Sequence, residues 1–186
     1  MIKVNTPLDD RAILGLQAGD EVLISGVVYT ARDKAHERFI ETLEKGDILP
    51  FNLEGQVLFY AGPAPAKSGA IIGSIGPTTS YRMDSFTPTL LACGVKGMIG
   101  KGSRSEEVRK AIRKNKSVYF VATGGTAALL SQHVVKAKVI AYEDLGPEAV
   151  YELELKDFPV IVAIDYRGKD FYVESLKVYS QEKNNF

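Results

Sequence analysis

The apolar residues of this chain occur in runs no longer than a β-strand, and this pattern limits what it can fold into. Val160–Ile164 is among the longest of these runs, whereas a membrane-spanning helix needs about 20 consecutive apolar residues. A composition of 45% hydrophobic and 25% charged residues is typical of a folded globule rather than a disordered segment. We therefore expect a single domain over residues 1–186 and, because no apolar signal-peptide core follows Met1, a cytoplasmic location.

Short strand-like runs alternate with segments of helical period in the middle of the chain. Strands are predicted over Glu21–Tyr29, Gln56–Ala61, Ala70–Ile75, Ser117–Ala122, Ala137–Tyr142 and Pro159–Ile164. Helices are predicted from Ala35 to Leu43, after a cap at Asp84 or Ser85, after a capping box of Ser103 and Glu106, and over Thr126–Val134. Gly26 interrupts the first strand and predicts a bulge or bend. This order indicates one α/β domain whose sheets are partly antiparallel.

Polar side chains gather at the junction of the first strand and the first helix, in the segment YTARDKAH at residues 29–36. Arg32 and His36 are four residues apart and share one face of a helix. A cation in the first turn of a helix opposes the helix dipole, and an anion bound there would resolve the conflict. The alternative is a basic face exposed to solvent, with Asp33 and Glu37 as neighbours.

A second polar segment, GSIGPTTSYRMD at residues 73–84, follows an apolar run and ends at a predicted helix. Its backbone N–H groups, its hydroxyls and Arg82 can bind a carboxylate or a phosphate. The Walker pattern is missing and GSIG is only a fragment of a phosphate loop, so a nucleotide site ranks lower. The alternative is that Thr78, Thr79 and Ser80 serve only as turn and cap residues.

A third segment, Gly100-Lys101-Gly102, places a lysine between two glycines that let an anion approach closely. An exposed lysine on a flexible loop is the alternative. Because loops at strand ends gather at one rim of a sheet, Arg32, Arg82 and Lys101 predict a cationic site for a small dianion such as a dicarboxylate. The chain has 23 basic and 23 acidic residues, so we expect neither a nucleic acid nor a membrane as its partner.

The single cysteine, Cys93, lies at the apolar end of a predicted helix, where we expect a buried and inert thiol. One cysteine excludes an internal disulfide and a self-contained iron–sulfur site. The start of another predicted helix, Gly124-Gly125-Thr126, is a weaker version of the anion-binding loops. His133 is assigned no role.

Five segments, in their order along the chain, carry a family resemblance. They are YTARDKAH at 29–36, YAGP at 60–63, GPTTSYRMD at 76–84, GKG at 100–102 and AYEDLGPEA at 141–149. Together they resemble the β subunit, or C-terminal domain, of class I fumarate hydratase and L-tartrate dehydratase. The likeness extends from about Asp20 to Phe171.

This resemblance implies a swivelling β/β/α domain with mixed sheets and helices packed on one layer. It implies the β subunit of a lyase of the hydro-lyase class, most directly a class I fumarate hydratase that converts fumarate and L-malate reversibly. The alternatives are an L-tartrate dehydratase β subunit, which forms oxaloacetate, and a non-catalytic subunit that binds dicarboxylates or has a structural role.

The resemblance also implies a [4Fe–4S] cluster held by three cysteines of a separate α subunit, hence a hetero-oligomer and no cofactor or metal site in this chain. By the same resemblance, Arg32 and Arg82 bind the substrate carboxylates, Lys101 binds substrate and the developing charge, and Thr78 transfers the proton. The loop Ser80-Tyr81 departs from the small residues common there in the family. Whether the substrate is fumarate or tartrate, whether Thr78 is the base, and the subunit stoichiometry stay open at this point.

Overall fold

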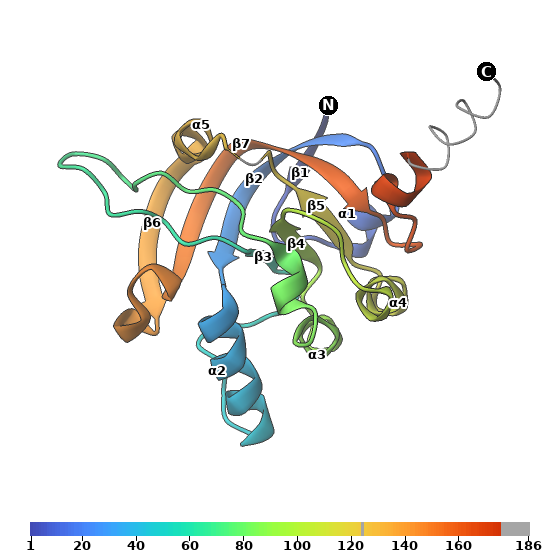
Figure 1. Ribbon diagram of the computed structural model, residues 1–186, viewed down its shortest axis with the longest axis horizontal. Helices are drawn as coiled ribbons and strands as arrows, with labels where there is room; N and C mark the ends of the chain where they lie inside the picture. Colours follow the sequence, from blue (N-terminus) through green and yellow to red (C-terminus); the bar gives the residue numbers. More distant parts are fainter. Residues whose placement is uncertain (124, 176–186) are drawn as a thin grey trace.

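The computed structural model describes residues 1–123 and 125–175, in which strands and helices alternate (Figure 1). The elements are β1 (Ile2–Asn5), α1 (Asp10–Leu14), β2 (Glu21–Thr30), α2 (Asp33–Glu44), β3 (Val57–Phe59), α3 (Thr87–Ala92), β4 (Gly97–Gly100), α4 (Glu106–Asn115), β5 (Val118–Val121), α5 (Ala127–Leu130), β6 (Val134–Ala141) and β7 (Val150–Ile164). Three 3₁₀ helices are η1 (Ser80–Met83), η2 (Ser131–His133) and η3 (Glu143–Glu148). In the described residues, no helix is both long and apolar enough to cross a membrane.

The strands form one mixed sheet in the order β1-β2-β3-β4-β5-β7-β6. Strands β2, β3, β4 and β5 are parallel neighbours, and β7 runs antiparallel to both β5 and β2. Because β7 joins the two ends of the parallel run, five strands close into a ring. Strand β1 extends the sheet beside the first half of β2, and β6 does so beside the first half of β7.

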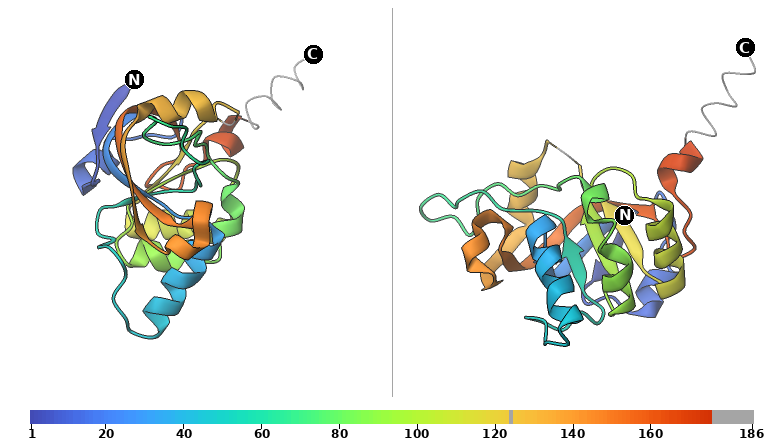
Figure 2. Two further views of the ribbon diagram at one scale, coloured as in Figure 1. Left: turned by 90° about the vertical axis from the view of Figure 1, so that its left-hand side faces the viewer. Right: turned by 60° about the horizontal axis from the view of Figure 1, so that its bottom comes forward.

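The ring separates two apolar cores, because successive residues of its strands point to opposite faces. Val57 and Phe59 belong to the core enclosed by the ring, to which α1 and α5 also contribute side chains. Leu58 and Tyr60 belong to the outer core, where helices α2, α3 and α4 cover one layer (Figure 2). Burial on both faces explains why β3, β4 and β5 read as continuous apolar runs without alternation. The expected mixed α/β architecture is thus confirmed, with three helices on one layer and two short ones near the enclosed core.

Most predicted elements are present, and Gly26 does form a bulge in β2. The pairing of β2 with β7 shifts between Ile24 and Gly26, and Gly26 has a φ of 105°. A Cβ atom at Gly26 would lie 2.6 Å from Oγ1 of Thr6, so a side chain does not fit there. The strand predicted over Pro159–Ile164 is the last part of a longer strand, β7, which begins at Val150.

The predicted strand over Ala70–Ile75 is wrong. This segment belongs to a long connection between β3 and η1, which reaches out beside β6 (Figure 1). It folds back on the proline-rich stretch before it, and the Ala64 N–H donates to the Ser74 carbonyl at 2.9 Å. Because Pro63 and Pro65 have no N–H groups, the two stretches cannot form a continuous ladder.

Two predicted helix caps are also wrong. Helix α4 is capped by Ser105, whose hydroxyl accepts from the Val108 N–H, and not by Ser103. Helix α3 follows Phe86 instead of Asp84 or Ser85. The helix predicted over Thr126–Val134 is shorter, since α5 and η2 end where β6 begins; Gly124, at its predicted start, lies outside the described residues.

Candidate functional site

Three loops at the carboxyl ends of neighbouring parallel strands carry the residues predicted for the site. Arg32 follows β2 and immediately precedes α2, the segment from Thr78 to Arg82 follows β3, and Lys101 follows β4. Since β2, β3 and β4 are parallel and adjacent, their ends meet at one rim of the ring, as expected for loops of this kind.

Backbone hydrogen bonds join the loop of Thr78 to the loop of Lys101. The Lys101 N–H donates to the Thr78 carbonyl at 3.3 Å, and the Ser80 N–H donates to the Lys101 carbonyl at 3.0 Å. The Thr78 N–H in turn donates to the carbonyl of Tyr60 at 2.7 Å, just beyond β3. These bonds tie the backbone of Thr78 to that of Lys101.

Arg82 connects this pair of loops to the start of α2. Its Nη2 donates to Oγ1 of Thr78 at 2.5 Å and lies 3.4 Å from Oδ2 of Asp33. The Arg82 side chain is about one-third exposed, at 37%, and can still donate to a ligand. A guanidinium that donates to a hydroxyl oxygen favours the deprotonated form of that hydroxyl. Besides its backbone bonds, Thr78 therefore has a side-chain contact with Arg82.

Arg32 has a partner that was not predicted from the sequence. Its Nη2 lies 3.5 Å from Oε1 of Glu148, and Oε2 of Glu148 accepts from the Lys34 N–H at 3.1 Å. The anion expected at the start of α2 is therefore a carboxylate of the chain itself. Gly62 makes room for this arrangement, because a Cβ there would lie 3.1 Å from Cδ of Arg32 and 2.4 Å from the Pro147 carbonyl.

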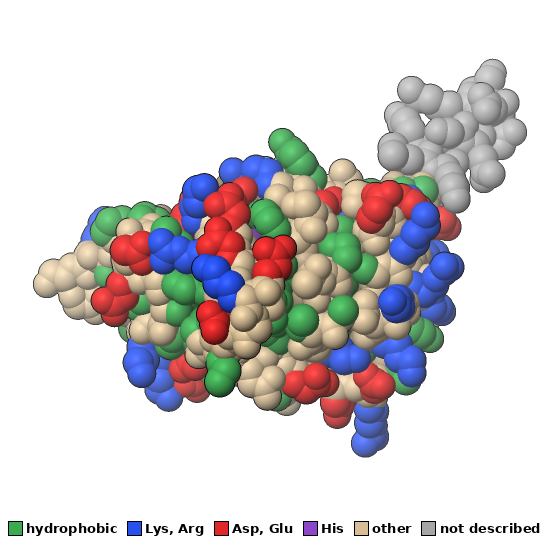
Figure 3. Space-filling model, turned by 90° about the horizontal axis from the view of Figure 1, so that it is seen from below, with side chains coloured by type: hydrophobic (Ala, Val, Ile, Leu, Met, Phe, Trp, Pro, Cys, Tyr) green, Lys and Arg blue, Asp and Glu red, His purple; other side chains and the backbone are tan. Residues whose placement is uncertain are grey.

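The basic side chains of this region lie among acidic ones. Figure 3 shows the molecule from below, the side toward which α2 and α3 project, with acidic and basic side chains next to one another. Arg32 and Arg82 are each near one carboxylate at a distance longer than a hydrogen bond. Lys101 is exposed. The rim thus combines three cations from three loops with one hydroxyl.

His36 lies beneath Arg32 and is fully buried. Its Nδ1 donates to the Arg32 carbonyl at 2.8 Å, and its ring packs edge-on against Tyr60, with 5.3 Å between the centroids. Burial lowers the pKa of His36 to about 4, although the hydrogen bond to Arg32 opposes this effect. The imidazole is therefore neutral at pH 7 and holds the backbone at Arg32, and it adds no charge to the rim.

Arg104 is the most deeply buried cation near the site, and it was not predicted from the sequence. Its side chain has 0% exposure, and its Nε donates to Oδ1 of Asp84 at 2.6 Å. Burial opposes the charge, but Tyr60 and Asp84 outweigh it and raise the pKa of Arg104 above its usual value. Asp84 is therefore a counter-ion and not the cap of α3, because its carboxylate accepts from Arg104 and from the Ser105 N–H. The only signal in the sequence was the proximity of Arg104 to the Gly-Lys-Gly segment.

Cys93 and His133 lie in other parts of the structure. Cys93 is exposed, so the prediction of a buried thiol is wrong; it follows the last turn of α3, where the chain leaves the core through Gly94. His133 is a half-buried residue before β6 whose Nδ1 donates to the Lys156 carbonyl at 3.0 Å. Within the described ranges, no three His, Cys, Asp or Glu side chains are grouped to hold a metal ion. With one cysteine in the whole sequence, the donor set of this chain does not fit an iron–sulfur cluster held by three cysteines.

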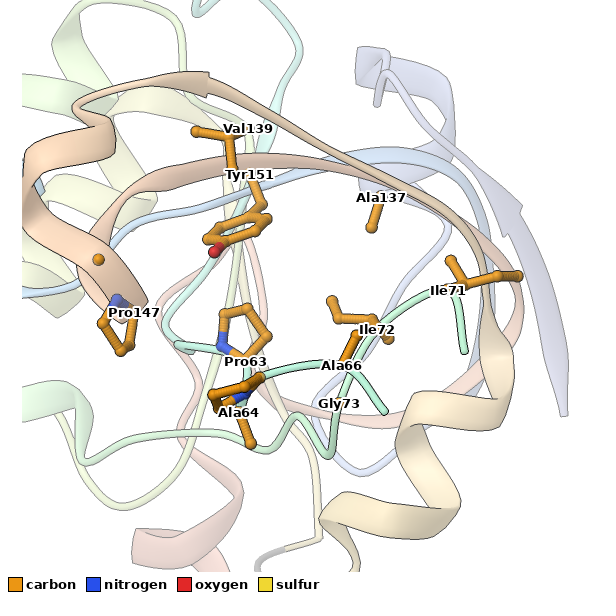
Figure 4. Close-up of a pocket in the computed structure, with 12 residues that line it drawn as sticks. Pro63, Ala64, Ala66, Ile71, Ile72, Gly73, Ala137, Val139, Pro147 and Tyr151 are labelled. Atoms are coloured by element: carbon orange, nitrogen blue, oxygen red, sulfur yellow. The ribbon is translucent and has the colours of Figure 1, made fainter. Parts of the chain in front are cut away.

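An apolar cavity of about 410 Å³ lies between the long connection and β6. Figure 4 shows Pro63, Pro147 and Tyr151 at one end of it and Ile71, Ile72 and Ala137 at the other. Pro147 directly precedes Glu148, the partner of Arg32. Because its lining carries few polar groups, the cavity lacks the chemistry expected of a dicarboxylate site.

Comparisons with known proteins agree with the resemblance seen in the five segments. Residues 1–175 match the family model described as Fumarase C-terminus. The chain is 38% identical over 181 residues to "Putative L(+)-tartrate dehydratase subunit beta" of Methanocaldococcus jannaschii, covering 94% of this chain and 93% of that protein. It is 31% identical over 186 residues to "L(+)-tartrate dehydratase subunit beta" of Escherichia coli K12, covering 97% and 91%.

A second group of similar proteins is much longer than this chain. The chain is 38% identical over 151 residues to "Fumarate hydratase class I, aerobic" of Escherichia coli K12, covering 80% of this chain. It spans only 28% of the length of that protein. The chain belongs to the fumarase C-terminus family.

Proposed function

We propose that this chain is the β subunit of a two-subunit hydro-lyase, which adds water reversibly to a C=C bond of a dicarboxylate. Fumarate hydration to L-malate is the first candidate reaction, and L-tartrate dehydration is the second. The similarity to two tartrate dehydratase β subunits over more than nine-tenths of their lengths supports the second. The swivelling β/β/α arrangement implied by the family is part of the same proposal.

One observation carries the proposal: three loops that meet at one rim carry Arg32, Arg82 and Lys101, and Arg82 already contacts the Thr78 hydroxyl. Arg32 and Arg82 bind the two substrate carboxylates, because planar guanidinium groups match carboxylates in two-point hydrogen bonding. The carboxylates of Glu148 and Asp33 lie 3.5 and 3.4 Å from these arginines. Those contacts are longer than hydrogen bonds, so both arginines keep donors for a ligand.

The proton is removed from the carbon next to a carboxylate, which moves negative charge onto that carboxylate. Lys101 and Arg82 then interact more strongly with the transition state than with the ground state, and this lowers the barrier. Thr78 transfers the proton through Oγ1, which accepts from Arg82 at 2.5 Å. A threonine is a poor base on its own, and a hydrogen bond donated by a guanidinium favours the deprotonated oxygen over the hydroxyl.

The cluster of this enzyme class belongs, in this proposal, to a separate α subunit. The single cysteine of the chain supports this assignment, because three cysteines are needed to hold the cluster. The β subunit supplies the carboxylate-binding rim and the proton-transfer group, and the cluster of the α subunit would supply a Lewis acid that accepts the hydroxide leaving from the neighbouring carbon. The two subunits together form a hetero-oligomer.

Co-expression with the candidate α subunit under anaerobic conditions tests the proposal. We expect hydration of fumarate or dehydration of L-tartrate, assayed in parallel, and a loss of activity in Arg32→Ala and Arg82→Ala. Arg38→Ala is the matched control, because Arg38 lies on α2 and pairs with Asp144, away from the three loops. Activity with neither substrate, combined with affinity for dicarboxylates, would instead favour a non-catalytic binding subunit. Intact catalysis in both arginine variants would favour a structural subunit.

A further inference from the structure

A buried tyrosine on β5 links the two loops that carry Thr78 and Lys101. The Tyr119 hydroxyl is 2.9 Å from Oγ of Ser80 and 2.9 Å from the Gly102 carbonyl. Tyr119 and Ser80 are both fully buried. Since Ser80 belongs to the first loop and Gly102 to the second, one hydroxyl contacts both loops from below.

Ser80 connects Tyr119 to the backbone of Lys101. The Lys101 N–H donates to Oγ of Ser80 at 3.1 Å, in addition to its contact with the Thr78 carbonyl. The approach is close because Gly100 has no side chain: a Cβ at Gly100 would lie 1.9 Å from Oγ of Ser80. Tyr119, Ser80 and the Lys101 backbone thus form a continuous set of hydrogen bonds under the rim.

Arg104 packs against Tyr119 and is part of a second side-chain link between the loops. Its guanidinium lies 4.9 Å from the Tyr119 ring centroid and pairs with Asp84, the residue that ends η1. Asp84 also accepts from the N–H of Ser105, after the second loop. Besides their backbone hydrogen bonds, the loops are therefore linked through buried side chains at Tyr119 and at the pair of Asp84 and Arg104.

We infer that Tyr119 is a positioning residue, which sets the distance between Thr78 and Lys101 through Ser80 and Gly102. The inference rests on the proposed function. It adds a residue that cannot contact the substrate, because its side chain is buried beneath the loops, but on which the geometry of proton transfer depends.

The hydroxyl of Tyr119 has to remain protonated to fulfil this role. Burial raises the pKa of Tyr119, and the hydrogen bond with Ser80 and the charge of Arg104 offset only part of that effect. The hydroxyl can therefore accept from Ser80 while it donates to the Gly102 carbonyl. A phenylalanine at this position fills the same space and loses both contacts.

Tyr119→Phe tests the inference, with Tyr29→Phe as the matched control. Tyr29 is also a strand residue whose hydroxyl donates one hydrogen bond, to Glu152 at 3.2 Å. Small displacements of reacting groups lower the turnover rate strongly, so we expect kcat of the complex to fall about 10- to 100-fold in Tyr119→Phe, with KM changed less than about threefold. Tyr29→Phe retains wild-type kcat. A wild-type kcat in folded Tyr119→Phe, or an equal fall in the control, overturns the inference.

Ser80→Ala removes the same link from its other side. If Tyr119 acts through Ser80, the double variant loses little more than either single variant, since both single variants remove the same contact between the Tyr119 and Ser80 hydroxyls. Fully multiplicative losses overturn the inference. Should Tyr119→Phe fail to fold, Ser80→Ala alone tests the inference. A wild-type kcat in Ser80→Ala overturns it, and a 10-fold or larger fall in kcat at unchanged KM supports it.

Hydrogen exchange of the Lys101 amide in the full chain separates this inference from the proposed function. We expect faster exchange in Tyr119→Phe than in wild type and no change in Tyr29→Phe. Unchanged exchange in Tyr119→Phe overturns the inference whatever the enzyme activity. Faster exchange in a complex that lacks hydro-lyase activity supports the link between the loops and counts against the proposed function alone.

Discussion

The pair of Asp84 and Arg104 allows a sharp prediction about stability, because removal of one partner leaves a buried charge. The Arg104 side chain has 0% exposure and that of Asp84 has 14%. In Asp84→Asn the shape is conserved, but the ion pair at 2.6 Å is lost. Breaking a buried ion pair on one side costs about 3 to 5 kcal/mol in unfolding free energy. Arg104 keeps its hydrogen bond to Thr87 at 2.7 Å and its contacts with two aromatic rings, so we expect about 3 kcal/mol, the lower end of that range.

Urea unfolding of the isolated chain measures this loss. Glu37→Gln is the matched control, because it removes one partner of an exposed ion pair with Lys34 and should cost less than about 0.5 kcal/mol. Replacing both buried partners, in Asp84→Leu with Arg104→Met, should recover part of the loss, since no charge is then left unpaired. An Asp84→Asn variant within about 1 kcal/mol of wild type, at an unchanged slope with urea, would refute the reasoning.

The site and its surroundings support three further predictions. Because burial lowers the pKa of His36 from 6.5 to about 4, the unfolded chain binds more protons between those values, so stability falls as pH drops through this range. His36→Gln should reduce that pH dependence by about 3 kcal/mol in urea titrations at pH 4 and 7, and an unchanged dependence would contradict it. Gly62→Ala places a methyl group 2.4 Å from the Pro147 carbonyl and should raise KM about 10-fold, whereas Gly15→Ala, which has room, should not. Thr78→Ala should lower kcat about 100-fold or more and slow exchange of the substrate proton with D2O; unchanged exchange would rule out Thr78 as the proton-transfer group.

Part of the arrangement of the candidate site was predictable from the sequence, because some of its charged residues directly follow strands. Arg32 and Lys101 each directly follow an apolar run that forms a parallel strand, and the carboxyl ends of such strands meet at one rim. Arg82 reaches this rim only after the long connection that follows β3. The apolar run at Ala70–Ile75 does not form the predicted strand. Pro63 and Pro65, in the stretch that lies beside it, lack N–H groups, so no ladder of hydrogen bonds forms there. An apolar run indicates burial, but it does not show which backbone groups will pair.

The contacts that hold the site could not be predicted, because they join distant parts of the chain. Glu148 reaches Arg32 from the opposite end of the sequence, and nothing in the segment before β7 marks it as a partner. In the sequence, Tyr119 is typical of a core residue and Arg104 of a surface residue. Only the tertiary structure places the Arg104 guanidinium over the Tyr119 ring. Pairings of this kind are properties of the tertiary structure.

The closed ring has a consequence for how the chain is made. Strand β7 covers Val150–Ile164 and pairs with β2, β5 and β6, so the ring cannot close until nearly all of the described chain has left the ribosome. Until then β2 and β5 have unpaired edges, which are prone to pairing with other chains. Contacts that span so much sequence also slow folding. During synthesis, the loops of Arg32, Thr78 and Lys101 are complete long before the strand that closes the ring beneath them.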